Sequence, residues 1–119
     1  MLTKDNIIAR LFEKFSFFRE QMAYEPDELL PYNIIGDFAL DFQKKFINFQ
    51  LAPREIDNFF DFANKMAESN DREVQNIFVV EVLEIFSDNE KTINIAKEKL
   101  NDKGKKLLEK ILKGWKDEK

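Results

Sequence analysis

The hydrophobic pattern is strongest in residues 73–86, where apolar side chains recur at three- and four-residue steps. That spacing places them on one face of an α-helix. The members of this stripe are Val74, Ile77, Phe78, Val82, Ile85 and Phe86. Further apolar residues widen the stripe, and a helix that is apolar over so much of its circumference is normally surrounded by other elements. We therefore expect a central, mostly buried helix with one narrow acidic ridge at Glu81 and Glu84.

Weaker amphipathic patterns predict the other helices. The first is expected over residues 3–22, the second from residue 32 or 36 to residue 50, and the third from Pro53 onward. A short fifth helix follows the central one, and a last helix follows a turn at residues 101–104. The predicted N-caps are Thr3, Asn70 and Ser87. Residues 24–31 hold two prolines and predict a loop or short turn, and the tail 116–119 is expected to fray.

Thirteen phenylalanines give the chain an unusual aromatic content. Most of them fall on the inward stripes, which favours core packing over a binding cavity. Met22, Phe49 and Trp115 are also expected to face the core. Phe17 and Phe62 lie slightly off their stripes, so these two are the candidates for exposed contact residues.

These patterns predict an all-α fold, with residues 1–119 forming a single domain. We expect a bundle of five to six amphipathic helices joined as antiparallel hairpins. A HEAT-like stack, with helix two on three and helix four on five, is the weaker alternative because the sequence shows no internal repeat.

The amino-acid composition limits the catalytic and metal-binding groups that the chain can use. The chain has no cysteine and no histidine. It therefore lacks thiol chemistry, the commonest general base and the commonest transition-metal ligand. No apolar run approaches the ~20 residues that a membrane span needs, and Asp5 and Arg10 interrupt any signal-peptide core. We expect a cytoplasmic protein that is not an enzyme, uses no cofactor and makes no membrane contact.

Charge is distributed unevenly along the chain. Residues 25–90 hold fifteen acidic and five basic residues, whereas residues 91–119 hold ten basic and five acidic residues. An acidic body attracts a basic protein and repels nucleic acid. The last helix is rich in lysine, but no arginine follows Arg72, so we expect no direct nucleic-acid binding.

Carboxylates on outward helix positions are the candidate binding residues. Asp37 and Asp41 lie one helical turn apart, as do Asp57 and Asp61, on two helices expected to be neighbours. These four residues and Glu84 are the predicted contacts for a partner with a basic surface. The ridge Glu81, Glu84 and Asp88 offers an alternative, because helical carboxylate clusters hold Mg²⁺ in all-α nucleotide phosphohydrolases. No second acidic motif follows that ridge, so solvated helix faces are favoured over a metal site.

The chain also resembles a known protein class. Tyr32, Asn33, Gly36, Asp37 and Phe38 precede an acidic, aromatic helix, and Asp71, Glu73, Val74 and Asn76 open a valine-rich one. Gly104 and Trp115 then lie in the last segment. This layout is similar to that of the small all-helical immunity proteins of bacterial polymorphic and contact-dependent inhibition toxin systems. The resemblance covers residues 32–115 and implies a cytoplasmic inhibitor of one cognate toxin domain, often a nuclease. A general helical adaptor with several weak partners is the third hypothesis.

Overall fold

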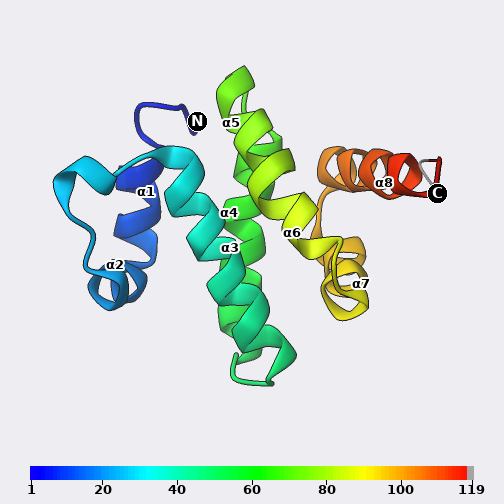
Figure 1. The fold of residues 1–119 in the computed structure, drawn as a ribbon, viewed down its shortest axis with the longest axis horizontal. Helices are drawn as coiled ribbons and strands as arrows, with labels where there is room; N and C mark the ends of the chain where they lie inside the picture. The colour runs from blue at the N-terminus through cyan, green and yellow to red at the C-terminus, as the bar shows by residue number, and fades with distance from the viewer. Residues whose placement is uncertain (118–119) are drawn as a thin grey trace.

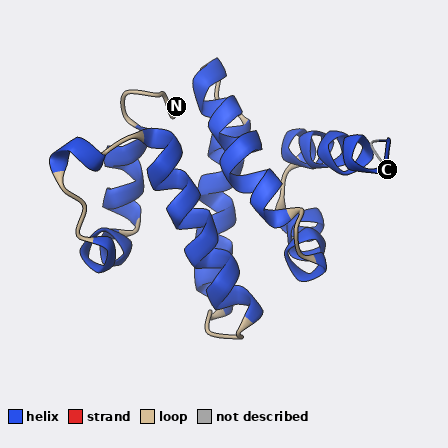
Figure 2. Cartoon of the chain, in the orientation of Figure 1, coloured by secondary structure: helices blue, strands red, loops and turns tan. Residues whose placement is uncertain are grey.

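The computed structural model describes the backbone of residues 1–117 and the side chains of residues 1–114. All regular elements in this part of the chain are helical (Figures 1 and 2). They are α1 (Ile7–Lys14), α2 (Ser16–Met22), the 3-10 turn η1 (Pro26–Glu28), α3 (Pro31–Ile47), α4 (Pro53–Ala67), α5 (Arg72–Ile77), the π-helical turn η2 (Phe78–Leu83), α6 (Glu84–Phe86), α7 (Glu90–Lys99) and α8 (Asp102–Asp117). The prediction of an all-α fold is confirmed.

Three of these elements form one continuous helix. α5, η2 and α6 follow one another without a break over residues 72–86, and we call them together the central helix. The described chain therefore has seven helices rather than the five to six predicted, because the expected helix over residues 3–22 is split in two. Of the tail predicted to fray, residues 116 and 117 belong to α8, and residues 118–119 lie outside the described part.

The middle of the molecule is made by α3, α4 and the central helix (Figure 1). α3 and the central helix run side by side in the same direction, and α4 passes behind them in the opposite direction. α1 and α2 flank this group on one side, and α7 and α8 flank it on the other. Short connections between successive helices explain the antiparallel arrangement of α3 with α4 and of α4 with the central helix.

Phenylalanine rings fill the space between α3 and α4. Phe42 and Phe59 stack with ring centroids 3.9 Å apart. Phe59 also lies 5.1 Å from Phe38, 5.3 Å from Phe60 and 5.5 Å from Phe86 of the central helix. Offset and edge-to-face pairs at these distances are favourable beyond the area that they bury. The prediction that most phenylalanines pack in the core is therefore confirmed.

The predicted first helix breaks at Phe15. The Phe15 backbone leaves the helical region, with φ −124° and ψ 57°. Its ring packs 4.7 Å from Phe38 and edge-on to Phe62, at 6.0 Å. No glycine or proline marks this break, because it results from packing against distant helices. The break leaves Phe17 73% exposed, as predicted. Met22 was predicted to face the core but is 36% exposed, so that prediction is wrong.

Phe62, the second candidate for an exposed contact, is only 3% exposed, so that prediction is wrong. Its ring lies edge-on to Phe15 and Phe38. On α4 alone, position 62 lies beside the apolar stripe and is therefore predicted to be exposed. The ring that covers it belongs to Phe15, at the break between α1 and α2.

Phe49 also contradicts its prediction. It was expected on the inner face of a helix reaching residue 50, but α3 ends at Ile47. Phe49 takes a left-handed conformation with φ 57° and is 85% exposed. The Gln50 N–H donates to the Lys45 carbonyl at 2.9 Å, which closes the end of α3 as the chain turns toward Pro53. Trp115 was expected in the core, and its side chain lies outside the described residues.

The N-caps lie one to three residues after the predicted ones, and Asn6 is the N-cap of α1. Thr3 does not begin a helix directly, but its Oγ1 accepts the Asn6 N–H, and Asn6 Oδ1 accepts the Thr3 N–H, ahead of α1. Asp71, rather than Asn70, caps the central helix by accepting the Glu73 N–H at 2.9 Å. Asn89, rather than Ser87, caps α7. The side-chain oxygens of Asp71 and Asn89 each satisfy a free N–H of the first helical turn.

Residues 101–104 do not form the predicted turn. α8 begins at Asp102, and Asn101 Oδ1 accepts the Gly104 N–H at 2.8 Å. Gly104 is buried against Leu100, so its lack of a side chain serves close packing. By contrast, Pro53 is the first residue of α4, as predicted.

Within the described residues, no helix has both the length and the apolar character needed to cross a membrane.

We predict that the Phe59 ring is a principal source of stability. Phe59→Ala should lower the free energy of unfolding by about 3–5 kcal/mol, because it opens a cavity among four other rings. Phe17→Ala, which removes an exposed ring from a helix, should change the free energy by less than about 0.5 kcal/mol. Urea denaturation of both variants measures the difference, and equal losses would contradict this description of the core.

Candidate functional site

A strongly charged concavity lies beside the N-terminal half of α3, and we call it the acidic hollow. It has a volume of about 500 Å³ and is open to solvent. Its lining residues are Tyr24, Asp27, Glu28, Leu30, Asn33, Gly36, Asp37, Leu40 and Glu81. Four of them are carboxylates and none is a lysine or arginine. Concave surfaces of one sign concentrate the electric field and attract ligands of the opposite charge.

The loop between α2 and α3 supplies one wall of the acidic hollow. Ala23 ends α2 in a left-handed conformation, with φ 49°, and turns the chain away. The Glu25 N–H then donates to Glu28 Oε1 at 2.8 Å, which closes the 3-10 turn η1. Pro26 suits the first position of such a turn, because its fixed φ is helical and it needs no N–H partner. The turn thereby holds Asp27 and Glu28 at the rim.

Asp37 is held in place by a tyrosine. The Tyr24 hydroxyl donates to Asp37 Oδ2 at 2.7 Å. Partial burial raises the pKa of Tyr24, and the hydrogen bond to Asp37 raises it further. Tyr24 therefore stays a neutral donor at physiological pH. It fixes the orientation of the Asp37 carboxylate without cancelling its charge.

Glu81 enters the hollow from the π-helical turn η2. A π-helical turn carries more residues than an α-helical turn and is often found at functional sites. Burial raises the pKa of Glu81, and the nearby carboxylates of Glu84 and Asp37 raise it further. The side chain lies directly over Gly36, where even a methyl group would collide with the Glu81 carboxylate. Gly36 thus leaves the space that the Glu81 carboxylate occupies in this position.

The structure separates the five predicted contact residues. Asp37 lines the hollow, and Glu84 is exposed beside Glu81. Asp41 lies one turn beyond, where it pairs with Lys45 at 3.0 Å and accepts a hydrogen bond from Gln21.

The α4 pair points elsewhere. Asp57 of α4 pairs with Lys99 of α7 at 2.9 Å. Asp61, which is also on α4, is exposed. Asp57 lies where α4 meets α7, Asp61 lies near Lys14 of α1, and neither lines the acidic hollow with Asp37. The packing of phenylalanines between the two helices explains this, since each helix turns its polar face away from the other.

Sequence reasoning missed three acidic members of the hollow as partner contacts. Asp27 and Glu28 were assigned only to a loop, and Glu81 was considered only as a metal ligand. The signal available was a loop with three acidic residues, at 25, 27 and 28, directly before the α3 helix that carries Asp37.

The alternative metal site receives no support from the geometry. Among the side chains of residues 1–114, no group of three or more carboxylates is arranged to hold a metal ion. The predicted ridge ends at Asp88, which follows α6 in a turn and is exposed.

Comparison with known proteins identifies one family. The family described as "Domain of unknown function (DUF7674)" matches residues 6–116. Neither the curated proteins nor the solved structures gave a match.

We predict that the Glu81 charge destabilises the free protein. The folded state holds a proton on Glu81 more tightly than the unfolded chain does, so stability falls as the pH rises through the raised pKa. Glu81→Gln should therefore raise Tm at pH 7. The gain should shrink as the pH falls to about 4, where the wild-type carboxyl is protonated as well.

Thermal unfolding followed by circular dichroism measures this effect. Glu109→Gln, an exposed change on α8, is the control and should leave Tm nearly constant. A Glu81→Gln variant that is no more stable than wild type at pH 7 would contradict the prediction.

Proposed function

We propose that this chain, which belongs to the DUF7674 family, is a protein-binding domain that captures a basic segment of its partner in the acidic hollow. The observation that carries the proposal is the lining of the hollow, with four carboxylates and no basic residue. Three other concavities of the described chain are lined by residues of both signs. A lysine or arginine of a partner would be attracted to the acidic hollow and would pair with carboxylates already held in position.

Apolar side chains next to the hollow favour a protein over a free cation. Leu30 is 57% exposed and Leu40 is 52% exposed, and both line it. Protein interfaces combine a few desolvated apolar anchors with charged groups at the rim. A basic segment that also carries an aliphatic or aromatic side chain would match both features.

The electrostatics of Glu81 also support this role. In the free protein, burial and then repulsion from the nearby carboxylates of Glu84 and Asp37 disfavour the charged form of Glu81 and raise its pKa. A partner cation placed among them would relieve this repulsion. The carboxylate repulsion destabilises the free protein, so its relief would contribute to the binding free energy.

We propose that the partner is a toxin domain, of the nuclease class implied by the resemblance to immunity proteins, and that binding takes place in the cytoplasm. A nuclease uses lysine and arginine side chains to hold phosphates. A protein that covers those side chains blocks the substrate by occlusion and needs no catalytic step of its own. The carboxylates of the acidic hollow would bind such side chains in place of phosphate.

The experiment uses the C-terminal domain of the protein encoded immediately upstream as the partner. The test variant is Asp37→Lys with Glu81→Lys. The matched control is Asp57→Lys with Asp61→Lys, which reverses the same number of charges on α4. At low salt, the test variant should associate about 10-fold more slowly or worse, with a flatter salt dependence, because steering is lost. The association rate of the control variant should fall by a smaller factor.

Stopped-flow fluorescence measures association, and growth during co-expression of the toxin domain measures protection. Circular dichroism verifies that both variants are folded. Equal association rates for the test and control variants would exclude the acidic hollow as the binding site. Equal binding of unrelated basic proteins would instead favour the general adaptor hypothesis.

A further inference from the structure

The acidic hollow follows the N-terminal part of α3. Four of its lining residues recur at three- and four-residue steps, which is one stripe of a helix, and these are Asn33, Gly36, Asp37 and Leu40. Leu30, the residue just before α3, lines the hollow as well. Because a helix rises 1.5 Å per residue, Leu30 and Leu40 lie roughly 15 Å apart along the helix axis. The hollow is therefore elongated and longer than one side chain.

Exposed leucines lie at the two ends of this length, and carboxylates lie between them. Leu30 and Leu40 are both exposed, and both line the hollow. Asp37 lies roughly 10 Å along the axis from the Leu30 end. Glu81 reaches the same region from the central helix, because its carboxylate lies over Gly36. The order along the hollow is thus apolar, acidic, apolar.

The dimensions favour an extended segment as the ligand. A β-strand rises about 3.3 Å per residue, and every second side chain points to the same side. Residues i and i+4 of such a segment therefore lie about 13 Å apart on one side, with residue i+2 between them. This spacing is close to the roughly 15 Å between the two leucines. A helix about 10 Å across would occupy roughly 1,200 Å³ over that length, so most of it would lie outside a hollow of about 500 Å³.

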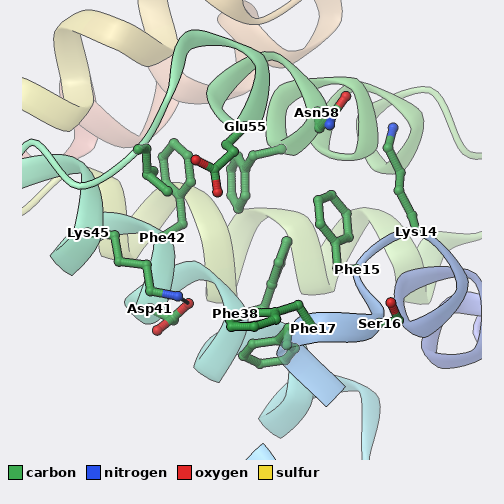
Figure 3. A pocket seen from close by; sticks show the side chains of 13 residues that line it. Lys14, Phe15, Ser16, Phe17, Phe38, Asp41, Phe42, Lys45, Glu55 and Asn58 are labelled. Atoms are coloured by element: carbon green, nitrogen blue, oxygen red, sulfur yellow. Dashed lines mark ion pairs between the residues drawn. The ribbon is translucent and has the colours of Figure 1, made fainter. Parts of the chain in front are cut away.

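The concavity lined mainly by phenylalanines suits such a segment less well (Figure 3). Lys14 and Lys45 line it, and Lys45 already pairs with Asp41 at 3.0 Å. These two ammonium groups would repel a basic ligand. In the acidic hollow, by contrast, none of the four carboxylates forms an ion pair with another described residue. Their charges are therefore available to a partner.

We propose that the acidic hollow takes an extended segment in which a lysine or arginine is flanked, two residues away on each side, by an apolar residue. This inference rests on the proposed function, because it specifies the ligand of the same site. The basic side chain lies between Asp37 and Glu81, and the apolar side chains contact Leu30 and Leu40. Charge provides the attraction, and the spacing of the apolar residues provides selectivity among basic segments.

Two blocked peptides of the same composition test the order of residues. The first, Gly-Leu-Ser-Arg-Ser-Leu-Gly, carries the proposed pattern, whereas the second, Gly-Arg-Ser-Ser-Leu-Leu-Gly, does not. NMR titration of the amide signals of α3 measures the dissociation constant of each peptide. The first should bind about 5-fold more tightly or better, because only its leucines reach both ends of the hollow. Equal dissociation constants would overturn the proposal.

Leucine variants test where the segment lies. Leu30→Ser and Leu40→Ser should each weaken binding of the first peptide about 5-fold, because each removes an apolar contact and no charge. Leu29→Ser is the matched control, since this neighbouring leucine is also exposed but lines a different concavity. It should leave the affinity unchanged. Circular dichroism verifies that all three variants are folded, and equal effects of Leu29→Ser and Leu30→Ser would contradict the proposed position.

The variant Asp37→Lys with Glu81→Lys separates this proposal from the proposed function. If both peptides bind the wild type equally and neither binds this variant, the spacing is overturned and the acidic hollow remains a site for basic groups. If the variant binds both peptides as the wild type does, the peptides bind elsewhere and both proposals are contradicted. If neither peptide shifts the α3 signals of the wild type at millimolar concentration, the spacing is overturned, and the association experiment with the upstream-encoded domain decides the proposed function.

Discussion

Stacking of aromatic rings between α3 and α4 is the interaction on which the rest of this structure depends. Phe42 and Phe59 lie 3.9 Å apart at its centre, and Phe38, Phe60 and Phe86 surround them. A planar ring can satisfy several neighbours at once, by stacking on one and presenting its edge to another. Helices from three parts of the chain are thereby fixed relative to one another. The polar faces of α3 and α4 are consequently turned in different directions.

Two concavities of different character adjoin this core. The ring of Phe15 packs on Phe38 where the first helix breaks, and a concavity lined mainly by phenylalanines lies there next to α2. On another part of α3, Gly36 leaves room for the Glu81 carboxylate, which extends over it into the acidic hollow. The first concavity has balanced charge, whereas the second is acidic.

The sequence predicted those features that depend on local periodicity. The central helix, the start of α4 at Pro53 and the inward phenylalanines follow from helical spacing and from the residues at helix ends. The break at Phe15 and the burial of Phe62 did not follow, because both depend on rings that are distant in sequence. Phe49 failed as a prediction for another reason, since helical periodicity carries no information on where a helix stops without glycine or proline.

For the binding residues, the sequence identified the kind of group but not its position. Asp37 and Glu84 lie at or beside the acidic hollow, as a search for outward carboxylates would find. Asp41 and Asp57 are engaged by Lys45 and Lys99, and spacing along one helix cannot show pairing between helices. The π-helical turn that carries Glu81 is equally hidden, because a single wider turn barely alters the hydrophobic pattern.

Repulsion among the carboxylates of the acidic hollow connects the structure to the proposed function. The proposal holds that this repulsion is relieved when a basic partner binds. The most direct measurement is an NMR titration of the Glu81 side-chain carboxyl carbon, with and without the upstream-encoded domain. The account predicts a raised pKa for Glu81 in the free protein and a clear fall on binding. A pKa that is the same in both states would contradict it.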